Sequence, residues 1–192
     1  MHINNNNLSK KILIWYDNNQ RTLPWRTIKN SKKKQYYRLL SEFMLQQTQV
    51  KTVIPYFVNF VNKIPNLKVL STTDNKKVLK LWEGLGYYRR VMYLKETCKQ
   101  IIDVFYGNIP EDVRDLLTLK GIGNYTAAAV SSIAYQKPNP AIDGNVKRIL
   151  SRIFLIPVFN SKIHKEMTEY LASVISLKHP GDFNQAMMEL GF

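Results

Sequence analysis

Hydrophobic positions along the chain recur at helical spacing almost everywhere. The first apolar face consists of Leu8, Ile12, Trp15 and Tyr16. This spacing predicts a helix over 8–19. The same spacing predicts further helices over 35–48, 50–63, 75–83, 87–106, 111–117, 124–135, 145–155, 162–177 and 182–190. No segment alternates apolar and polar residues long enough to predict a strand, so the predicted fold class is all-α.

Composition adds a basic character to this helical chain. With 192 residues, 45% of them hydrophobic, it can bury a core, and no apolar run approaches the ~18–20 residues of a bilayer span. The net charge of +14 favours a nucleic-acid partner, although AT-rich coding sequence also raises the lysine and asparagine content. The run Lys32-Lys33-Lys34 fits either a DNA-binding surface or a solvated loop.

The N-terminus and the cysteine content point to the cytoplasm. Met1-His2-Ile3 and the four asparagines after it lack the apolar stretch of a signal peptide. Because Cys98 is the single cysteine, the chain forms no intramolecular disulfide and builds no cage of thiolates around a metal. We therefore expect a cytoplasmic protein without a membrane anchor.

The segment from Lys120 to Gly123 is the most informative stretch of the sequence. Gly121 and Gly123 flank one apolar residue between two predicted helices, which allows a tight hairpin that another chain can approach closely. Its amides and the positive end of the next helix suit a phosphate oxygen, with Ile122 anchored in the core. A plain turn between helices is the alternative. The basic chain favours binding of the DNA backbone, which positions a protein without selecting a sequence.

Two acids stand out for their surroundings. Glu42 lies among apolar residues of a predicted helix, where burial would raise its pKa, unless it lies on the solvent face. Asp143 precedes Gly144-Asn145 at a helix start, where backbone N–H bonds would lower its pKa and keep it ionised. Taken singly, the structural interpretation is preferred for each: a solvent-face acid and a helix cap.

Seven segments, taken together, change that preference. They are Leu23-Pro24-Trp25-Arg26, Ser41-Glu42-Phe43-Met44-Leu45-Gln46-Gln47-Thr48-Gln49-Val50, Thr52-Val53-Ile54-Pro55-Tyr56-Phe57, Leu81-Trp82-Glu83-Gly84-Leu85-Gly86-Tyr87-Tyr88-Arg89, the hairpin, Asp143-Gly144-Asn145-Val146-Lys147-Arg148 and Phe183-Asn184-Gln185-Ala186-Met187-Met188. In this order they closely resemble adenine DNA glycosylases of the MutY type, within the helix-hairpin-helix glycosylase superfamily. The similarity runs from about residue 10 to the end, and Met-Leu-Gln-Gln-Thr with Gly-Leu-Gly-Tyr-Tyr is specific to this branch.

The resemblance implies a base excision repair enzyme. It would hydrolyse the N-glycosidic bond of adenine mispaired with 8-oxoguanine or guanine in double-stranded DNA. Glu42 matches the general acid that protonates the base, and Asp143 matches the carboxylate that stabilises the sugar cation. Asn145 matches a residue that keeps the site in order. Tyr125 stands where the lyase branch has a lysine nucleophile, so the resemblance implies base release without strand cleavage.

The resemblance also implies a set of DNA contacts around an extruded base. The wedge residues are Gln47 and Tyr87, and Thr48 contacts 8-oxoguanine; core packing is the alternative for Tyr87. The adenine pocket is lined by Trp25, Arg26, Leu45 and Gln185. The backbone-binding hairpin consists of Lys120, Gly121, Ile122 and Gly123.

The implied fold has two helical lobes with DNA in the cleft between them. Residues 31–139 would form the lobe with the hairpin, and residues 1–30 plus 140–192 the other, with Glu42 and Asp143 facing each other. We expect a monomer, associated with the nucleoid if the cell is prokaryotic.

Two departures from the family qualify this expectation. In the family, four cysteines that hold a [4Fe-4S] cluster, and then a domain that recognises 8-oxoguanine, follow the position of Gly191; neither is present in these 192 residues, and Cys98 cannot replace the cysteines. The chain is therefore expected to ligate no cofactor. The loop around Thr27–Lys34 is four residues longer than in the family. A catalytically impaired DNA-binding remnant stays an alternative, as does an endonuclease III-like glycosylase, which Tyr125 disfavours.

Overall fold

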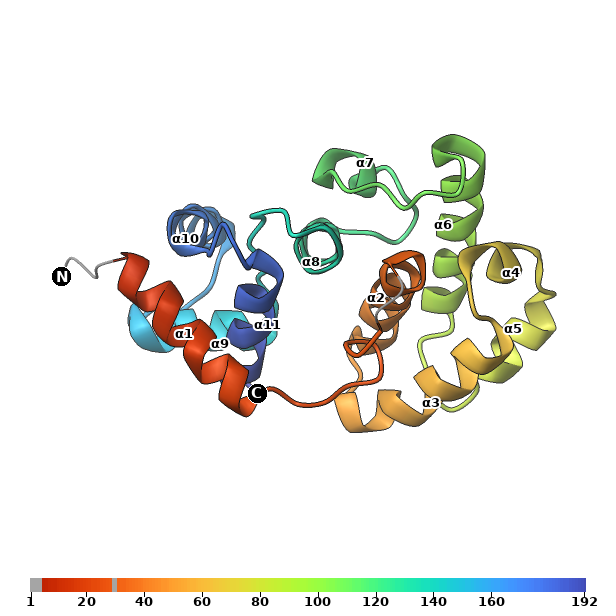
Figure 1. The fold of residues 1–192 in the computed structure, drawn as a ribbon, viewed down its shortest axis with the longest axis horizontal. Coiled ribbons are helices and arrows are strands. Elements are labelled where there is room, and N and C mark those ends of the chain that lie inside the picture. Colours follow the sequence, from red (N-terminus) through yellow and green to blue (C-terminus); the bar gives the residue numbers. More distant parts are fainter. Residues whose placement is uncertain (1–4, 29–30) are drawn as a thin grey trace. The chain divides into compact units, whose positions relative to one another are not determined.

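The computed structural model describes residues 5–28 and 31–192, and this part of the chain is helical without strands (Figure 1). Its helices are α1 (Asn5–Asn19), α2 (Ser31–Leu45), α3 (Val50–Lys63), α4 (Leu67–Thr72), α5 (Asn75–Trp82), α6 (Arg89–Phe105), α7 (Val113–Leu117), α8 (Asn124–Tyr135), α9 (Gly144–Ile153), α10 (Ser161–Val174) and α11 (Pro180–Leu190). The predicted all-α class is confirmed. None of the described helices is long and apolar enough to cross a membrane.

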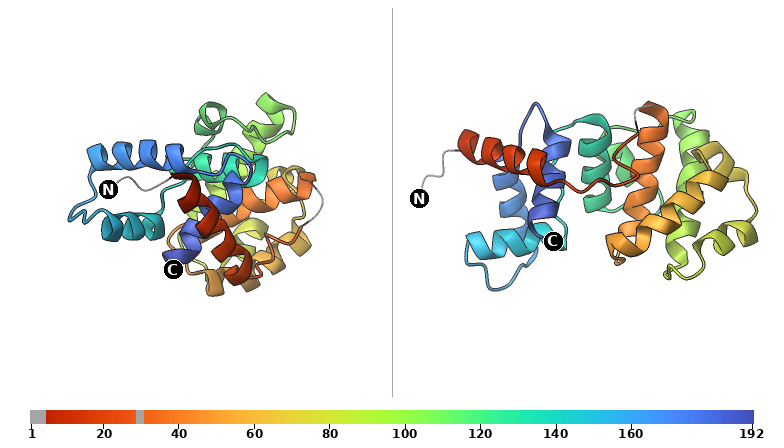
Figure 2. Two further views of the ribbon diagram at one scale, coloured as in Figure 1. Left: turned by 60° about the vertical axis from the view of Figure 1, so that its left-hand side comes forward. Right: turned by 60° about the horizontal axis from the view of Figure 1, so that its bottom comes forward.

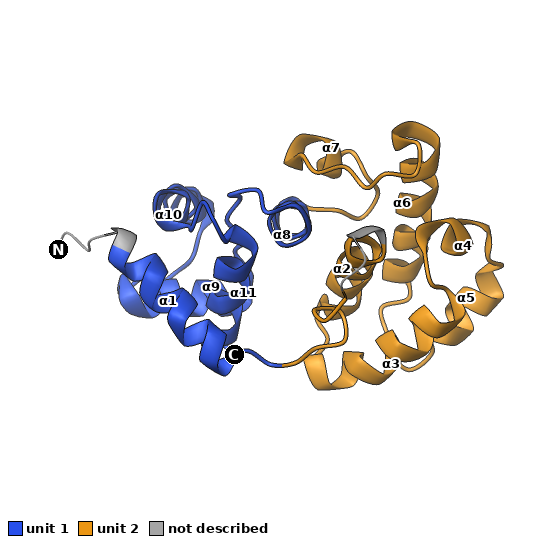
Figure 3. Cartoon of the chain, in the orientation of Figure 1, with its two compact units in different colours: residues 1–21, 124–192 blue, residues 22–123 orange. Residues whose placement is uncertain are grey.

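The described residues pack into two compact units (Figure 3). Unit 1 combines the chain up to Arg21 with Asn124–Phe192, and unit 2 is the continuous segment Thr22–Gly123. Residues 1–4 and 29–30 lie outside the described residues. The first range is part of the N-terminal stretch predicted to lack a signal peptide. The second is part of the loop predicted to be longer than in the family.

Helix α6 is the centre of unit 2, since α2, α4 and α5 all pack against it. Aromatic side chains pack elsewhere in the unit: the Phe57 ring of α3 makes edge contacts with Trp25 at 5.2 Å and with Tyr37 of α2 at 5.4 Å between ring centres. Phe60 and Trp82 form a similar edge contact at 5.9 Å. Such rings bury a large apolar area each, and they hold the helices that carry the predicted site residues.

Helix α11 has the same central position in unit 1. It packs against α1, α8 and α9, and the views of Figure 2 agree that α1 runs beside it. Ile12 and Tyr16, from the first predicted apolar face, are buried there with Phe183 and Leu150. This burial explains why a unit made largely of the C-terminal third includes the N-terminal helix.

The sequence pattern predicted where most helices lie more accurately than where they begin and end. The pattern missed α4, whose six residues are too few for a periodicity, although Asn66 caps it by accepting the Val69 N–H. It extended α2 to residue 48, whereas α2 ends at Leu45. It also began α6 at residue 87 rather than at Arg89.

The border between the two compact units falls after Gly123, whereas the predicted lobes divide at residue 139. Helix α8 belongs to unit 1 because Ala128, Ala129 and Ile133 pack with Ala141 and Met188. Its alanine-rich sequence gives α8 a small, closely packed face that α11 can approach. The division into catalytic lobes stays a prediction.

Candidate active site and nucleic-acid interface

Glu42 is a buried acid on α2, with only 7% of its surface exposed. Its chain neighbours Phe43 and Met44 are buried as well, so the carboxyl group lies away from bulk water. The alternative of a solvent-face acid is therefore wrong. Leu45, three residues further and at the last position of α2, shares its face of the helix and is partly buried.

Asp143 caps the N-terminus of α9, as predicted. Its Oδ1 accepts the backbone N–H of Val146 at 2.8 Å, and its Oδ2 accepts Nδ2 of Asn145 at 3.0 Å. Arg148 Nη2 in turn donates to Oδ1 of Asn145 at 2.6 Å and to the carbonyl oxygen of Gly191. The guanidinium thereby fixes which side of the Asn145 amide faces Asp143. The sequence did not single out Arg148, although its i,i+3 spacing from Asn145 on a helix is a usable signal.

The predicted lowering of the Asp143 pKa is wrong. Burial raises the pKa of this carboxyl above its ordinary value, and the hydrogen bonds from Val146 and Asn145, which lower it, are the smaller effect. The sequence shows the cap but not the depth at which α9 sits in unit 1. Asp143 is thus a stronger base than an ordinary aspartate while its oxygens stay fixed by hydrogen bonds.

Tyr125 and Gln185 lie in unit 1 with Asp143. Tyr125 is in the first turn of α8, partly buried, and its hydroxyl lies 3.9 Å from Sδ of Met188 on α11. Gln185 is buried on α11, where its Nε2 donates to the carbonyl oxygen of Gly181 at 3.3 Å. Unit 1 therefore holds one acid, the tyrosine and one predicted pocket residue.

The predicted hairpin is present at the end of unit 2. Gly121 has a φ of +76°, and a Cβ there would lie 2.8 Å from Cβ of Tyr93, so only glycine fits without strain. Ile122 is buried, which confirms it as the anchor. The amide of Lys120 donates to Oε1 of Gln100 at 2.8 Å. Gly121 and Gly123 are exposed, and their backbone is the part of the hairpin that a phosphate can approach.

Gln47 and Tyr87 each occupy a left-handed turn outside the helices. Their φ values are +57° and +48°, a conformation that costs a non-glycine residue roughly 1–2 kcal/mol. Tyr87 is 61% exposed, so core packing is wrong for this ring. Strained backbone that presents exposed side chains is frequent at functional sites, because the surrounding structure must hold it in place.

The other predicted contacts of unit 2 lie near these turns or in the aromatic core. Thr48 closes the turn after α2 through its backbone N–H, which donates to the Leu45 carbonyl oxygen at 3.3 Å. Trp25 is buried against Phe57, and the Arg26 amide donates to the Leu23 carbonyl oxygen at 2.8 Å. Trp25 is thus part of the buried aromatic core of unit 2.

Arg90 is a functional candidate that the sequence analysis missed. It is buried, on a helix face shared with Leu94 and Ile101, and it reaches the turns of Gln47 and Tyr87. An arginine at i, i+4 and i+11 spacing with apolar residues is a detectable signal, because a cation on a buried face needs several partners.

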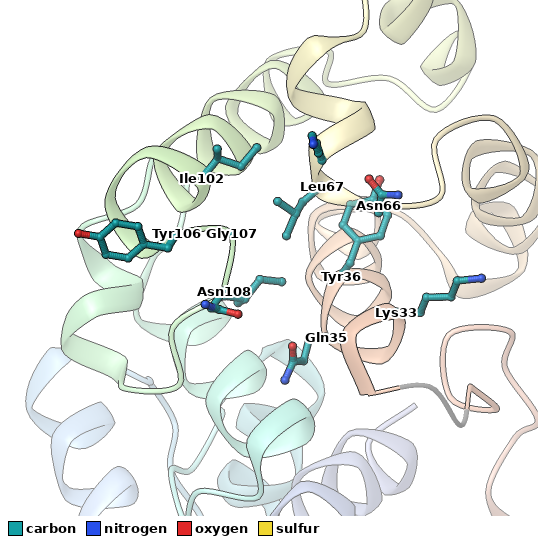
Figure 4. Close-up of a pocket in the computed structure, with 11 residues that line it drawn as sticks. Lys33, Gln35, Tyr36, Asn66, Leu67, Ile102, Tyr106, Gly107 and Asn108 are labelled. Atoms are coloured by element: carbon teal, nitrogen blue, oxygen red, sulfur yellow. The ribbon is translucent and has the colours of Figure 1, made fainter.

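The described part of unit 2 also contains a pocket of about 810 Å³, located toward the C-terminal end of α6 (Figure 4). Its wall includes Tyr36, Leu67, Ile102 and Asn108, and none of the predicted site residues. Ile102 lies roughly 18 Å along α6 from Arg90, at the 1.5 Å rise per residue of a helix. This pocket is therefore separate from the candidate DNA-binding turns.

The described residues do not fit an iron–sulfur cluster. Cys98 is buried in α6, where burial raises the pKa of its thiol to about 12. No group of three or more His, Cys, Asp or Glu side chains in the described part could hold a metal ion. Because such a cluster uses four cysteine ligands, no chemical step of this chain is assigned to one.

Comparisons with known proteins identify a family and similar chains. Residues 40–175 match the family described as HhH-GPD superfamily base excision DNA repair protein. Over 94% of its length the chain is 39% identical to the adenine DNA glycosylase of Buchnera aphidicola subsp. Baizongia pistaciae, and 38% identical to that of Homo sapiens. It spans 50% of the first protein and 34% of the second, so it corresponds to about half or less of these relatives.

Solved structures share the fold at lower identity. A thermostable thymine-DNA glycosylase superposes with a TM-score of 0.84 at 24% identity, over 97% of this chain and 85% of that one. An endonuclease III in a non-covalent DNA complex gives 0.77 at 18% identity, over 95% and 81%. The predicted helix-hairpin-helix glycosylase fold is confirmed.

Proposed function

The chain belongs to the HhH-GPD superfamily of base excision DNA repair proteins, and we propose that it acts as an adenine DNA glycosylase. The observation that carries the proposal is the 38–39% identity to adenine DNA glycosylases over 94% of the chain, which spans both units. The substrate is double-stranded DNA with adenine opposite 8-oxoguanine or guanine. We infer that the enzyme acts as a monomer. It would be located in the cytoplasm and, in a prokaryotic cell, associated with the nucleoid.

Two acids with different surroundings support this chemistry. Breaking the N-glycosidic bond expels adenine, which leaves readily only when one of its nitrogens is protonated, and Glu42 is the acid for that step. The sugar then becomes an oxocarbenium-like cation that a nearby anion stabilises, and Asp143 supplies this charge. Asn145 and Arg148 keep one Asp143 oxygen in place, so the carboxylate needs little reorganisation when the cation forms.

The proposal requires that one nucleotide reach both acids, although they belong to different units. A structure of the DNA complex should bring the two carboxyl groups within roughly 12 Å, which one sugar and its base can span. A larger separation would contradict a shared site.

Tyr125 makes the enzyme monofunctional. A phenol cannot form the imine that a lysine amine forms with the sugar, so the product is an abasic site in an intact strand. The remaining contacts serve extrusion of the base: Gln47 and Tyr87 fill the gap, Thr48 contacts 8-oxoguanine, and the hairpin from Lys120 to Gly123 binds the backbone. Trp25, Arg26, Leu45 and Gln185 line the adenine pocket.

A single-turnover assay on three duplexes tests the proposal. Adenine opposite 8-oxoguanine and opposite guanine should be released, and adenine opposite thymine should not. Binding of all three duplexes without any base release would refute the activity and favour a DNA-binding remnant.

A further inference from the structure

We propose that Arg90 is a positioning residue that fixes two exposed turns, Gln46–Thr48 and Leu85–Tyr87, in one arrangement, so that Gln47 and Tyr87 enter the duplex together. This inference rests on the proposed function for its DNA step. It goes beyond that function by assigning a role to a residue that touches neither base nor sugar.

The contacts of the Arg90 guanidinium reach both turns. On the side of α2, Nη1 donates to the carbonyl oxygens of Phe43 at 3.1 Å and Met44 at 2.9 Å, and also to that of Gln46. Its Nη2 donates to Oγ1 of Thr48 at 3.1 Å. One side chain therefore binds the last turn of α2 and the turn that presents Gln47.

The second turn is bound by the same guanidinium. Nη2 donates to the carbonyl oxygens of Leu85 at 3.4 Å and Gly86 at 3.2 Å. The guanidinium carbon also lies 5.1 Å from the centre of the Tyr87 ring, and the Arg90 amide donates to the Tyr87 carbonyl oxygen at 2.9 Å. The residue thus fixes the backbone before Tyr87 and contacts the face of its ring.

All these hydrogen-bond acceptors are neutral oxygen atoms, and they are spread over two turns. The residue that binds them therefore needs several donors that point in different directions, which a guanidinium has. Two of the acceptors, the carbonyl oxygens of Phe43 and Met44, belong to the last turn of α2. The unpaired carbonyl groups there carry partial negative charge, and this last turn contains no basic residue. A guanidinium spreads its donors over a rigid plane, whereas a lysine ammonium offers three donors at one point. Only the former can serve two separate turns at once.

The left-handed conformations explain why the turns need an external partner. Gln47 and Tyr87 have φ values of +57° and +48°, and neither residue lies in a helix that would hold it. If Arg90 is removed, each turn can relax independently toward ordinary backbone angles. The two side chains would then no longer share one geometry at the mispair.

Lys95 provides a matched control for the experiment. It is the other cation on the buried face of α6, exposed to the same 8% as Arg90. Its ammonium donates to the carbonyl oxygen of Thr73, just after α4, at 2.6 Å and to Oδ1 of Asn75, the first residue of α5. This segment has no predicted DNA contacts. Lys95→Met therefore also deletes a buried cation, but away from the two turns.

Hydrogen exchange of the free protein tests the arrangement without DNA. The Thr48 amide closes the first turn, and the Leu85 amide donates to the Trp82 carbonyl oxygen at the start of the second. Both should exchange roughly tenfold faster or more in both Arg90→Met and Arg90→Lys. Both should stay unchanged in Lys95→Met. Equal exchange in wild type and Arg90→Met, or full protection in Arg90→Lys, would overturn the proposal. Thermal unfolding of all variants identifies any that fails to fold, and Arg90→Lys keeps the charge in that case.

Base extrusion tests the DNA step. 2-Aminopurine is placed at the target adenine opposite 8-oxoguanine, and its fluorescence rises when it leaves the stack. Saturating wild type and Lys95→Met should raise the fluorescence, whereas the Arg90 variants should lose most of the rise while binding undamaged duplex within about twofold of wild type. Extrusion by Arg90→Lys at the wild-type level would overturn the inference. A wild type that extrudes no base would refute the proposed function, and the exchange data would still decide the role of Arg90.

Discussion

The hairpin offers a prediction whose size follows from the structure, the substitution Gly121→Ala. Forcing alanine to a φ of +76° costs roughly 1–2 kcal/mol. The added Cβ would also lie 2.8 Å from Cβ of Tyr93 and 3.2 Å from Cε1 of Phe43, both in packed positions, and overpacking of this kind costs about 1–3 kcal/mol. The two effects together predict a loss of about 3 kcal/mol in the free energy of unfolding.

Gly123→Ala is the control within the same hairpin. Gly123 has no atom within 4 Å of the position that a Cβ would take, and its φ is not positive. Alanine there should change stability by less than about 1 kcal/mol, in either direction.

Urea unfolding followed by circular dichroism measures both variants. With a slope of about 2 kcal/mol per molar urea, Gly121→Ala should lower the midpoint by roughly 1.5 M, and Gly123→Ala by much less. Equal midpoints for the two variants would refute the left-handed hairpin as the structure describes it. Because the hairpin backbone faces the DNA in the proposed function, Gly121→Ala should also weaken binding of undamaged duplex.

Three further predictions concern the chemistry. Glu42→Gln removes the proton donor, so single-turnover adenine release should fall by ~10²–10⁴-fold with DNA binding retained; release at the wild-type rate would exclude Glu42 as the acid. Because burial raises the pKa of Asp143, its anion is lost at a higher pH than an ordinary aspartate, so the acid limb of the rate profile should lie above 3.8; a limb below that value would contradict this. Tyr125→Lys returns an amine to α8 and should give a covalent DNA adduct on borohydride reduction, which wild type should not form.

The hydrophobic pattern was sufficient for the positions of the longer helices, but not for the burial of Glu42. Val53, Phe57 and Phe60 recur at helical spacing, and α3 has the bounds that this spacing predicts. The cap at Asp143 was also predictable, because an acid before a glycine and an apolar helix is a local signal. Glu42 followed from its apolar neighbours once the surrounding segments resembled a family.

Features that depend on distant partners were not predictable. The last carbonyl groups of α2, at Phe43 and Met44, are bound by Arg90, about 45 residues further along the chain. The pKa of Asp143 is set by burial in unit 1, which depends on how α9 packs against α11. Such effects are tertiary and leave no local periodicity.

The composition of unit 1 has a consequence for synthesis on the ribosome. Unit 2 is one continuous segment and is complete once Gly123 has emerged, whereas Ile12 and Tyr16 are buried against Phe183, which is made much later. At about 5–20 residues per second, α1 waits roughly 10–35 s for this partner with its apolar face uncovered. Arg21, which pairs with Glu189 at 2.6 Å, joins the two ends only then. Helix α1 is therefore made early but stays without its main packing partner until α11 has been made.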